Sequence, residues 1–262
     1  MSETISVEAA TVTTGTGSDF STAPWPTVRR VLEVFGWSMV TILVFTGLSV
    51  VLLRAGFMAQ NLGAAGAELI ETDPFNGRYI KHTVATWLHL IPGFLVMVLG
   101  PMQFMRWIRN RWTKFHRMCG RVFILAAGTG GVSGVIIGVF DPFMGVGGQG
   151  FNESMATAFF SVYVLFCLVM AYRRIRQRKF GQHREWMVRS FALLLGIATE
   201  RLILTALQIN TDIDMAVLFG TTFWMGIIAN MAAAEIWINL TRTPGNGARH
   251  WKDVDAKARA GN

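Results

Sequence analysis

The chain has few charged residues for its length. Only 15% of its 262 residues are Asp, Glu, Lys or Arg, whereas soluble domains carry about 25%. Apolar residues make up 52% of the chain, and the mean hydropathy is +0.40. This composition argues against a soluble domain and indicates a protein embedded in a membrane.

The motifs of several enzyme classes are also absent. The sequence has no phosphate-cradling loop, no zinc-type Cys/His spacing, no GxSxG turn and no HExxH pair. The glycine-rich segment 145–150 is not a nucleotide fingerprint, because no strand precedes it. The two cysteines, Cys119 and Cys167, lack motif spacing and are expected to be free thiols in a reducing setting. A binding role is therefore expected rather than an enzymatic one.

Long apolar runs dominate the rest of the chain. A helix needs about 20 apolar residues to cross the hydrocarbon core, and open strands would leave backbone groups unsatisfied in lipid. The sequence thus predicts an all-α, polytopic membrane bundle over residues 31–240, between polar cytoplasmic tails at 1–30 and 241–262. The expected spans are about 33–54, 83–105, 121–140, 154–172, 187–208 and 215–239.

Basic residues are concentrated in two segments, each between two apolar runs. They are Arg106–Arg121 (RWIRNRWTKFHRMCGR) and Arg173–Arg189 (RRIRQRKFGQHREWMVR). Because Lys and Arg stay on the cytoplasmic side of membranes, both segments are expected to be cytoplasmic loops. All but four of the 24 Lys and Arg residues fit this orientation, the exceptions being Arg54, Arg78, Lys81 and Arg201. The sequence therefore predicts a bacterial inner-membrane protein with both termini in the cytoplasm.

The same distribution explains the net charge of +8 and the isoelectric point near 10.2. Basic loops at a membrane surface attract anionic lipid head groups. Membrane lipids are accordingly expected partners, and nucleic acid is not.

An internal repeat is suggested by two short matches. Asp73-Pro74-Phe75 and Asp141-Pro142-Phe143 each precede a span, and a glycine follows at the same offset in both. We interpret 73–140 and 141–208 as a duplicated two-helix hairpin, with chance similarity between two apolar hairpins as the alternative. The repeat predicts architecture rather than activity.

Three polar residues lie inside the expected spans at a similar depth. His89 is in the second span, and Glu200 and Arg201 are in the fifth. Ionised groups are costly in a membrane and usually have a partner or a task, so these three form a candidate polar site. The alternative is a structural charge pair. Because adjacent helical residues point about 100° apart, Glu200 and Arg201 are expected to face different neighbours.

Two further pairs lie at the boundary of the basic loops. His116 and His183 come from different spans and could hold a haem iron or contribute to a metal site. Each precedes an arginine, so an interaction with lipid phosphate is the alternative. Arg189 and Glu235 lie at a similar depth and are expected to form a structural ion pair between the fifth and sixth spans.

Two motifs resemble a known family. The first is Gly100-Pro101-Met102-Gln103-Phe104, followed by His116-Arg117 and Gly120-Arg121. The second is His183-Arg184-Glu185-Trp186-Met187-Val188-Arg189-Ser190-Phe191-Ala192-Leu193. Over about residues 80–240 the chain resembles the domain-of-unknown-function family numbered 2306, and Arg201 falls where that family has an intramembrane Arg. Glu200 departs from it, because a small or hydroxylated residue is expected there.

The resemblance implies a multi-pass helical bundle and no particular activity. It also implies a shared polar framework, whose members are His89, His116, His183, Arg189, Arg201 and Glu235. The sequence as a whole predicts a non-enzymatic accessory subunit or binding protein for a lipid, a quinone or a larger membrane complex. One alternative is a redox protein that binds b-type haem or quinone. Another is a small transporter that uses His89, Glu200 and Arg201.

Overall fold

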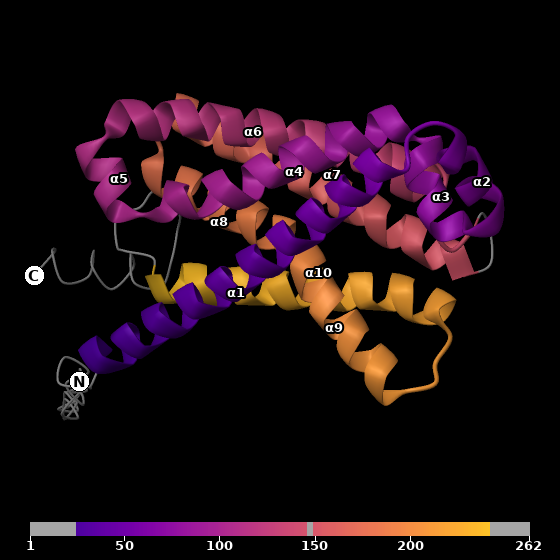
Figure 1. Ribbon diagram of the computed structural model, residues 1–262. Helices are drawn as coiled ribbons and strands as arrows, with labels where there is room; N and C mark the ends of the chain where they lie inside the picture. The colour runs from indigo at the N-terminus through magenta and orange to yellow at the C-terminus, as the bar shows by residue number, and fades with distance from the viewer. Residues whose placement is uncertain (1–24, 146–148, 242–262) are drawn as a thin grey trace, which may run out of the picture. The chain divides into compact units, whose positions relative to one another are not determined.

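The computed structural model describes residues 25–145 and 149–241, and all regular elements in these ranges are helices (Figure 1). The predicted all-α fold class is confirmed. The predicted tails lie outside the described residues, except where the first and last helices extend into them. In chain order the elements are α1 (Trp25–Gln60), α2 (Ala64–Thr72), α3 (Pro74–Lys81), α4 (Thr83–Phe104), α5 (Arg106–Arg111), α6 (Thr113–Val135), the π-helical turn η2 (Ile136–Phe140), α7 (Gln149–Arg176), α8 (Phe180–Leu194), α9 (Gly196–Asn210) and α10 (Met215–Thr241).

Six helical segments in the described residues are long and apolar enough to cross a membrane, as the sequence predicts. They are formed by α1, α4, α6 with η2, α7, α8 with α9, and α10. Several extend beyond the apolar runs. α6 begins at Thr113 and α8 at Phe180, because Lys and Arg are good helix formers and can continue a helix out of the apolar layer. His116 and His183 are therefore on helices rather than in loops.

The chain divides into two compact units, residues 1–39 and 40–262. The described part of the first unit is the beginning of α1, residues 25–39. The contacts described below all lie within the second unit. Within it, the proposed repeats 73–140 and 141–208 each contain two spans, and the duplication stays a prediction.

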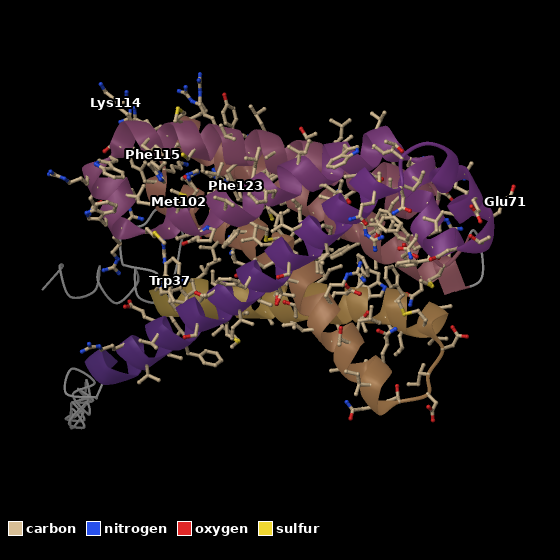
Figure 2. The ribbon with its side chains drawn as sticks, viewed as in Figure 1. Trp37, Glu71, Met102, Lys114, Phe115 and Phe123 are labelled. Atoms are coloured by element: carbon tan, nitrogen blue, oxygen red, sulfur yellow. The ribbon has the colours of Figure 1, made fainter. Side chains whose placement is uncertain are left out.

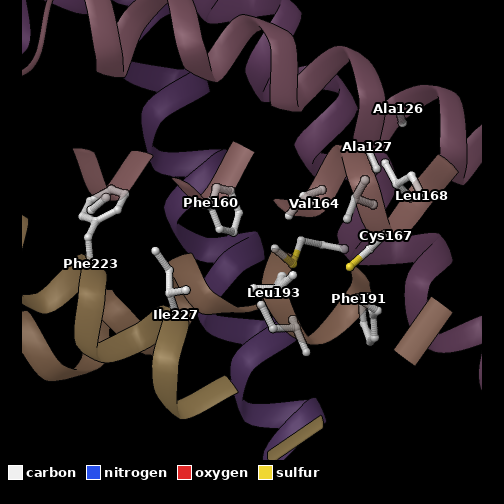
Figure 3. Close-up of a cluster of buried hydrophobic side chains, with 14 of the residues drawn as sticks. Ala126, Ala127, Phe160, Val164, Cys167, Leu168, Phe191, Leu193, Phe223 and Ile227 are labelled. Atoms are coloured by element: carbon white, nitrogen blue, oxygen red, sulfur yellow. The ribbon is translucent and has the colours of Figure 1, made fainter. Parts of the chain in front are cut away.

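The core of the second unit joins side chains of α4, α6, α7, α8, α9 and α10, part of which Figure 3 shows. Phe123, Leu193 and Phe219 are among its largest side chains, and none is more than 1% exposed. α4 joins this core at Gly100, where the ring of Phe191 occupies the space that a Cβ would take, 2.1 Å from it. Lipid tails are as apolar as these side chains, so close packing rather than water exclusion holds the helices together.

The fifth span is broken at Leu195, between α8 and α9. The side-chain amide of Asn230 in α10 donates to the carbonyl of Ala192, with a separation of 2.8 Å. A Cβ on Gly226 would lie 2.6 Å from the carbonyl oxygen of Gly196, so only a glycine permits this close approach of α10. The break is therefore supported by α10, and it places Glu200 near the start of α9.

The second unit carries different charges at its two ends. We call the end with α5 and the α7–α8 turn the basic-loop end, and the end with α2, α3 and the η2–α7 loop the acidic-loop end. Figure 2 shows Lys114 at the first end and Glu71 at the second. This separation of charge matches the two basic segments in the sequence.

Candidate functional site

At the acidic-loop end, Asp141 is the centre of an ion-pair network. Arg78 Nε lies 3.2 Å from Asp141 Oδ1, and Lys81 Nζ and His82 Nε2 lie 2.7 and 2.8 Å from Oδ2. Partial burial alone would raise the pKa of Asp141. The hydrogen bonds from Lys81 and His82, together with the positive charges of Arg78 and Lys81, instead lower this pKa to about 2. Asp141 is thus held as a carboxylate that ties α3 to the end of η2.

The loop after Asp141 is fixed by a buried carboxylate. The backbone amides of Phe143 and Met144 each donate to one oxygen of Glu153, both at 3.0 Å. Glu153 is 1% exposed, and Arg78 donates to the carbonyl of Phe143. The carboxylate takes two backbone donors, as a buried acid requires.

The start of α3 is capped by Asp73. Its side chain accepts hydrogen bonds from the backbone amide of Asn76 at 3.1 Å and from the side-chain amide of Asn76 at 2.6 Å. These hydrogen bonds lower the pKa of Asp73. Arg54 of α1 donates to Asn76 at 2.7 Å, and its guanidinium carbon lies 3.8 Å from the ring centroid of Tyr79. The polar groups of this end are therefore used to hold its own helices together.

Glu200 and Arg201 form an ion pair in α9. Arg201 Nε lies 3.3 Å from Glu200 Oε2, and the hydroxyl of Thr222 donates to Oε1 at 3.2 Å. Glu200 is fully buried, whereas the Arg201 side chain is 24% exposed and lies over the ring of Phe219. Glu200 thus contacts Thr222 and Arg201 contacts Phe219, two residues of the same helix α10, while the two side chains also pair with each other. Both are long enough to bend toward each other although their Cα–Cβ bonds diverge.

His89 belongs to a different set of contacts. Its Nδ1 lies 2.9 Å from the carbonyl oxygen of Gly130 and 3.3 Å from the hydroxyl of Ser133. Ser133 donates to the carbonyl of Leu88 at 3.2 Å. That carbonyl lacks its usual helical donor because the residue four positions later is Pro92. In the described residues the structure thus joins Glu200 to Arg201 and places His89 at a proline site between α4 and α6.

At the basic-loop end, Arg189 and Glu235 connect α8 to α10. Arg189 donates to both carboxylate oxygens of Glu235, at 2.5 and 2.9 Å, and stacks over Trp186 at 4.7 Å from the ring centroid. The bidentate geometry fixes the relative register of the two helices. The pair predicted from the sequence is present.

His116 and His183 are brought to the same end from α6 and α8. They lie close enough for their charges to interact, and His116 also interacts with Arg109. His183 Nδ1 lies 2.9 Å from the carbonyl oxygen of Ala171. Because a carbonyl only accepts, Nδ1 donates, and a neutral His183 then carries its lone pair on Nε2.

The buried polar atoms at this end that lack a hydrogen-bond partner among the described residues include Nε2 of Gln103, Nδ1 of His116 and Nε of Arg174, on α4, α6 and α7. Gln103 is only 7% exposed, and its Oε1 lies 3.1 Å from where a Cβ of Gly120 would be. Gly120 is one turn along α6 from His116, so Gln103 lies against the same helix that carries the histidine.

Sequence reasoning did not identify Gln103 or Arg174 as candidate site residues. Gln103 was visible as a polar residue inside the apolar run 83–105. Arg174 is one of many arginines in its segment, so the sequence offers no signal that separates it from Arg173. Among the residues that the structure describes, no group of three or more His, Cys, Asp or Glu side chains is placed to hold a metal ion.

A family model described as a predicted membrane protein, DUF2306, matches residues 86–238, which is more than half of the chain. The match includes Gln103, His116, Arg174 and His183. No curated protein and no solved structure matches the chain. The resemblance seen in the sequence motifs is confirmed, and the chain belongs to the DUF2306 family of membrane proteins.

Proposed function

We propose that this protein is a non-enzymatic membrane binding protein or accessory subunit, with a site for a lipid or quinone at its basic-loop end. The observation that supports it is the set of unpartnered polar atoms on Gln103, His116 and Arg174. More than about 90% of buried polar groups in proteins have a partner. A buried polar group without one costs about 1–3 kcal/mol. A bound ligand that supplies partners to three helices removes this cost.

The ligand test compares two glutamine variants. The protein is purified in mild detergent, extracted with organic solvent and analysed by mass spectrometry for lipids and quinones. Gln103→Leu is expected to lose the ligand that co-purifies with the wild type. Gln208→Leu, at an exposed position in α9, is expected to retain it. Identical extracts from all three proteins would contradict the assignment of this site.

We also propose that the basic-loop end faces the cytoplasm of a bacterial inner membrane. The support is the concentration of Lys and Arg at this end. The native cysteines, Cys119 and Cys167, are buried, so introduced cysteines can report the orientation. In right-side-out vesicles a membrane-impermeant maleimide is expected to label Glu71→Cys and not Lys114→Cys. The reverse pattern would overturn this orientation.

A second candidate function is electron transfer through a b-type haem between His116 and His183. It is favoured by the placement of both histidines at one end and by the hydrogen bond from His183 Nδ1 to Ala171. Metal-binding histidines commonly donate their other ring nitrogen in this way. If haem is bound, the reduced protein should show b-type absorbance that disappears in His116→Ala and His183→Ala and persists in His82→Ala. A colourless wild type would exclude this candidate.

A further inference from the structure

The unpartnered atoms at the basic-loop end indicate the chemistry of the missing partner. Gln103 Nε2 and Arg174 Nε can only donate hydrogen bonds, and His116 Nδ1 can donate in one tautomer and accept in the other. A group that satisfies all three must therefore be rich in acceptor atoms. A phosphate offers several acceptor oxygens in different directions, whereas each carbonyl of a quinone offers one.

The charge of this end favours an anion. His116 interacts electrostatically with Arg109 and Arg117, and Arg174 brings a further guanidinium. The buried carboxylate nearby on α8 is Glu185, which is 4% exposed and interacts with Arg189. Arg109 of α5 and Arg117 of α6 thus bring positive charge to His116, and Arg174 adds a guanidinium at the same end from α7. Arginine is well suited to phosphate, because charge-assisted hydrogen bonds to it are short and strong.

We propose that the site holds the phosphate head group of an anionic phospholipid. This inference rests on the proposed binding function and specifies its ligand. The donors come from three different helices at the end of the bundle where basic groups gather. Basic sites between membrane helices on the cytoplasmic side are a known mode of recognition for such head groups. Gln103 is the most buried of the three residues, and Arg174 supplies donor and charge together.

The experiment measures lipid binding to the delipidated full-length protein by native mass spectrometry. The probes are phosphatidylglycerol, diacylglycerol with the same acyl chains, inorganic phosphate and ubiquinone. Phosphatidylglycerol is expected to bind at least about tenfold more tightly than diacylglycerol, as loss of one charge-assisted hydrogen bond alone would give. Equal binding of the two lipids would overturn the phosphate assignment.

Two neighbouring arginines provide the matched comparison. Arg174→Gln should weaken phosphatidylglycerol binding about tenfold. Arg173→Gln removes the same charge from an exposed side chain one residue away and should change it by less than about twofold, because water and salt screen that charge. Equal effects of the two variants would show general attraction to basic loops and would overturn the site.

The glutamine supplies a second test that does not depend on a large change in shape. Gln103→Glu keeps the size of the side chain and replaces donors with a carboxylate, so it should weaken phosphatidylglycerol binding more than Gln103→Leu. Each variant is first required to elute as a single species on size exclusion. If Gln103→Glu binds like the wild type, the phosphate does not contact this residue and the proposal fails.

The other probes separate this inference from the proposed function. If inorganic phosphate binds and competes fully with phosphatidylglycerol, the site recognises phosphate. The ligand would then be a soluble phosphate anion and not a lipid head group. If ubiquinone binds instead and depends on Gln103, the binding function is supported and the phosphate inference is overturned. If none of the probes binds, both are contradicted.

Discussion

The two ends of this bundle differ in whether their buried polar groups have hydrogen-bond partners. At the acidic-loop end Asp141 pairs with Arg78, Lys81 and His82, and both oxygens of Glu153 accept backbone amides. At the basic-loop end Gln103, His116 and Arg174 each have a buried atom without a partner in the described residues. Buried polar groups that are satisfied stabilise one arrangement. We infer that the acidic-loop end is a structural clamp and that the basic-loop end is completed by another molecule.

The largest expected effect is that of Asp141→Asn. This change removes the charge that pairs with Arg78, Lys81 and His82 and leaves three donors facing one neutral amide. We expect a loss of about 3 kcal/mol in the free energy of unfolding, since hydrogen bonds to charged groups contribute about 1.5–3 kcal/mol each and are not additive. Denaturant unfolding in detergent measures it. Glu71→Gln, at an exposed position of the same end, is the control, and equal stability of the two variants would refute the clamp.

A pH titration tests the same clamp without a mutation. The folded pKa of Asp141 is about 2, below its ordinary value of 3.8, so its stabilisation is complete above about pH 4 and is lost as the pH falls toward 2. The difference in pKa corresponds to about 2 kcal/mol. Unfolding measured across this range should show a smaller pH dependence in Asp141→Asn than in the wild type. Parallel curves would mean that Asp141 does not carry this stabilisation.

A smaller loss is expected for Glu235→Gln at the basic-loop end. The Glu235 side chain is 47% exposed, and solvent screening limits such pairs to about 1 kcal/mol even with bidentate geometry. A double-mutant cycle with Arg189→Gln isolates the coupling between the two residues. A coupling above about 3 kcal/mol, the level typical of a buried pair, would make this end as strongly clamped as the other.

The smallest loss of stability is expected for Gln103→Leu. In the delipidated protein this change should not lower the unfolding free energy, because it removes a buried donor whose missing partner itself costs about 1–3 kcal/mol. With ligand present, the wild type should gain stability and the variant should gain less. A loss above about 2 kcal/mol in delipidated protein would indicate a structural partner for Gln103 and would remove the contrast between the ends.

The candidate site could be predicted from the sequence only in part. The ion pair of Arg189 and Glu235 follows from their similar depth on neighbouring spans. His116 and His183 follow from their matching positions next to the basic loops. The role of His89 does not follow, because its partners depend on how α6 crosses α4 near Pro92. Gln103 and Arg174 stand out only when burial and missing partners are known.

The sequence by itself determined the six spans and the separation of basic and acidic ends. The thickness of the bilayer sets the length of apolar runs, and charged residues are costly inside it. Both features can therefore be identified from short stretches of the sequence. The tertiary structure decided which polar groups meet. The break at Leu195, the contact of Glu200 with Thr222 and the unpartnered atoms at the basic-loop end depend on how distant segments pack, as Gly226 does against Gly196. These contacts are determined by side-chain packing, which the hydropathy of the sequence does not predict.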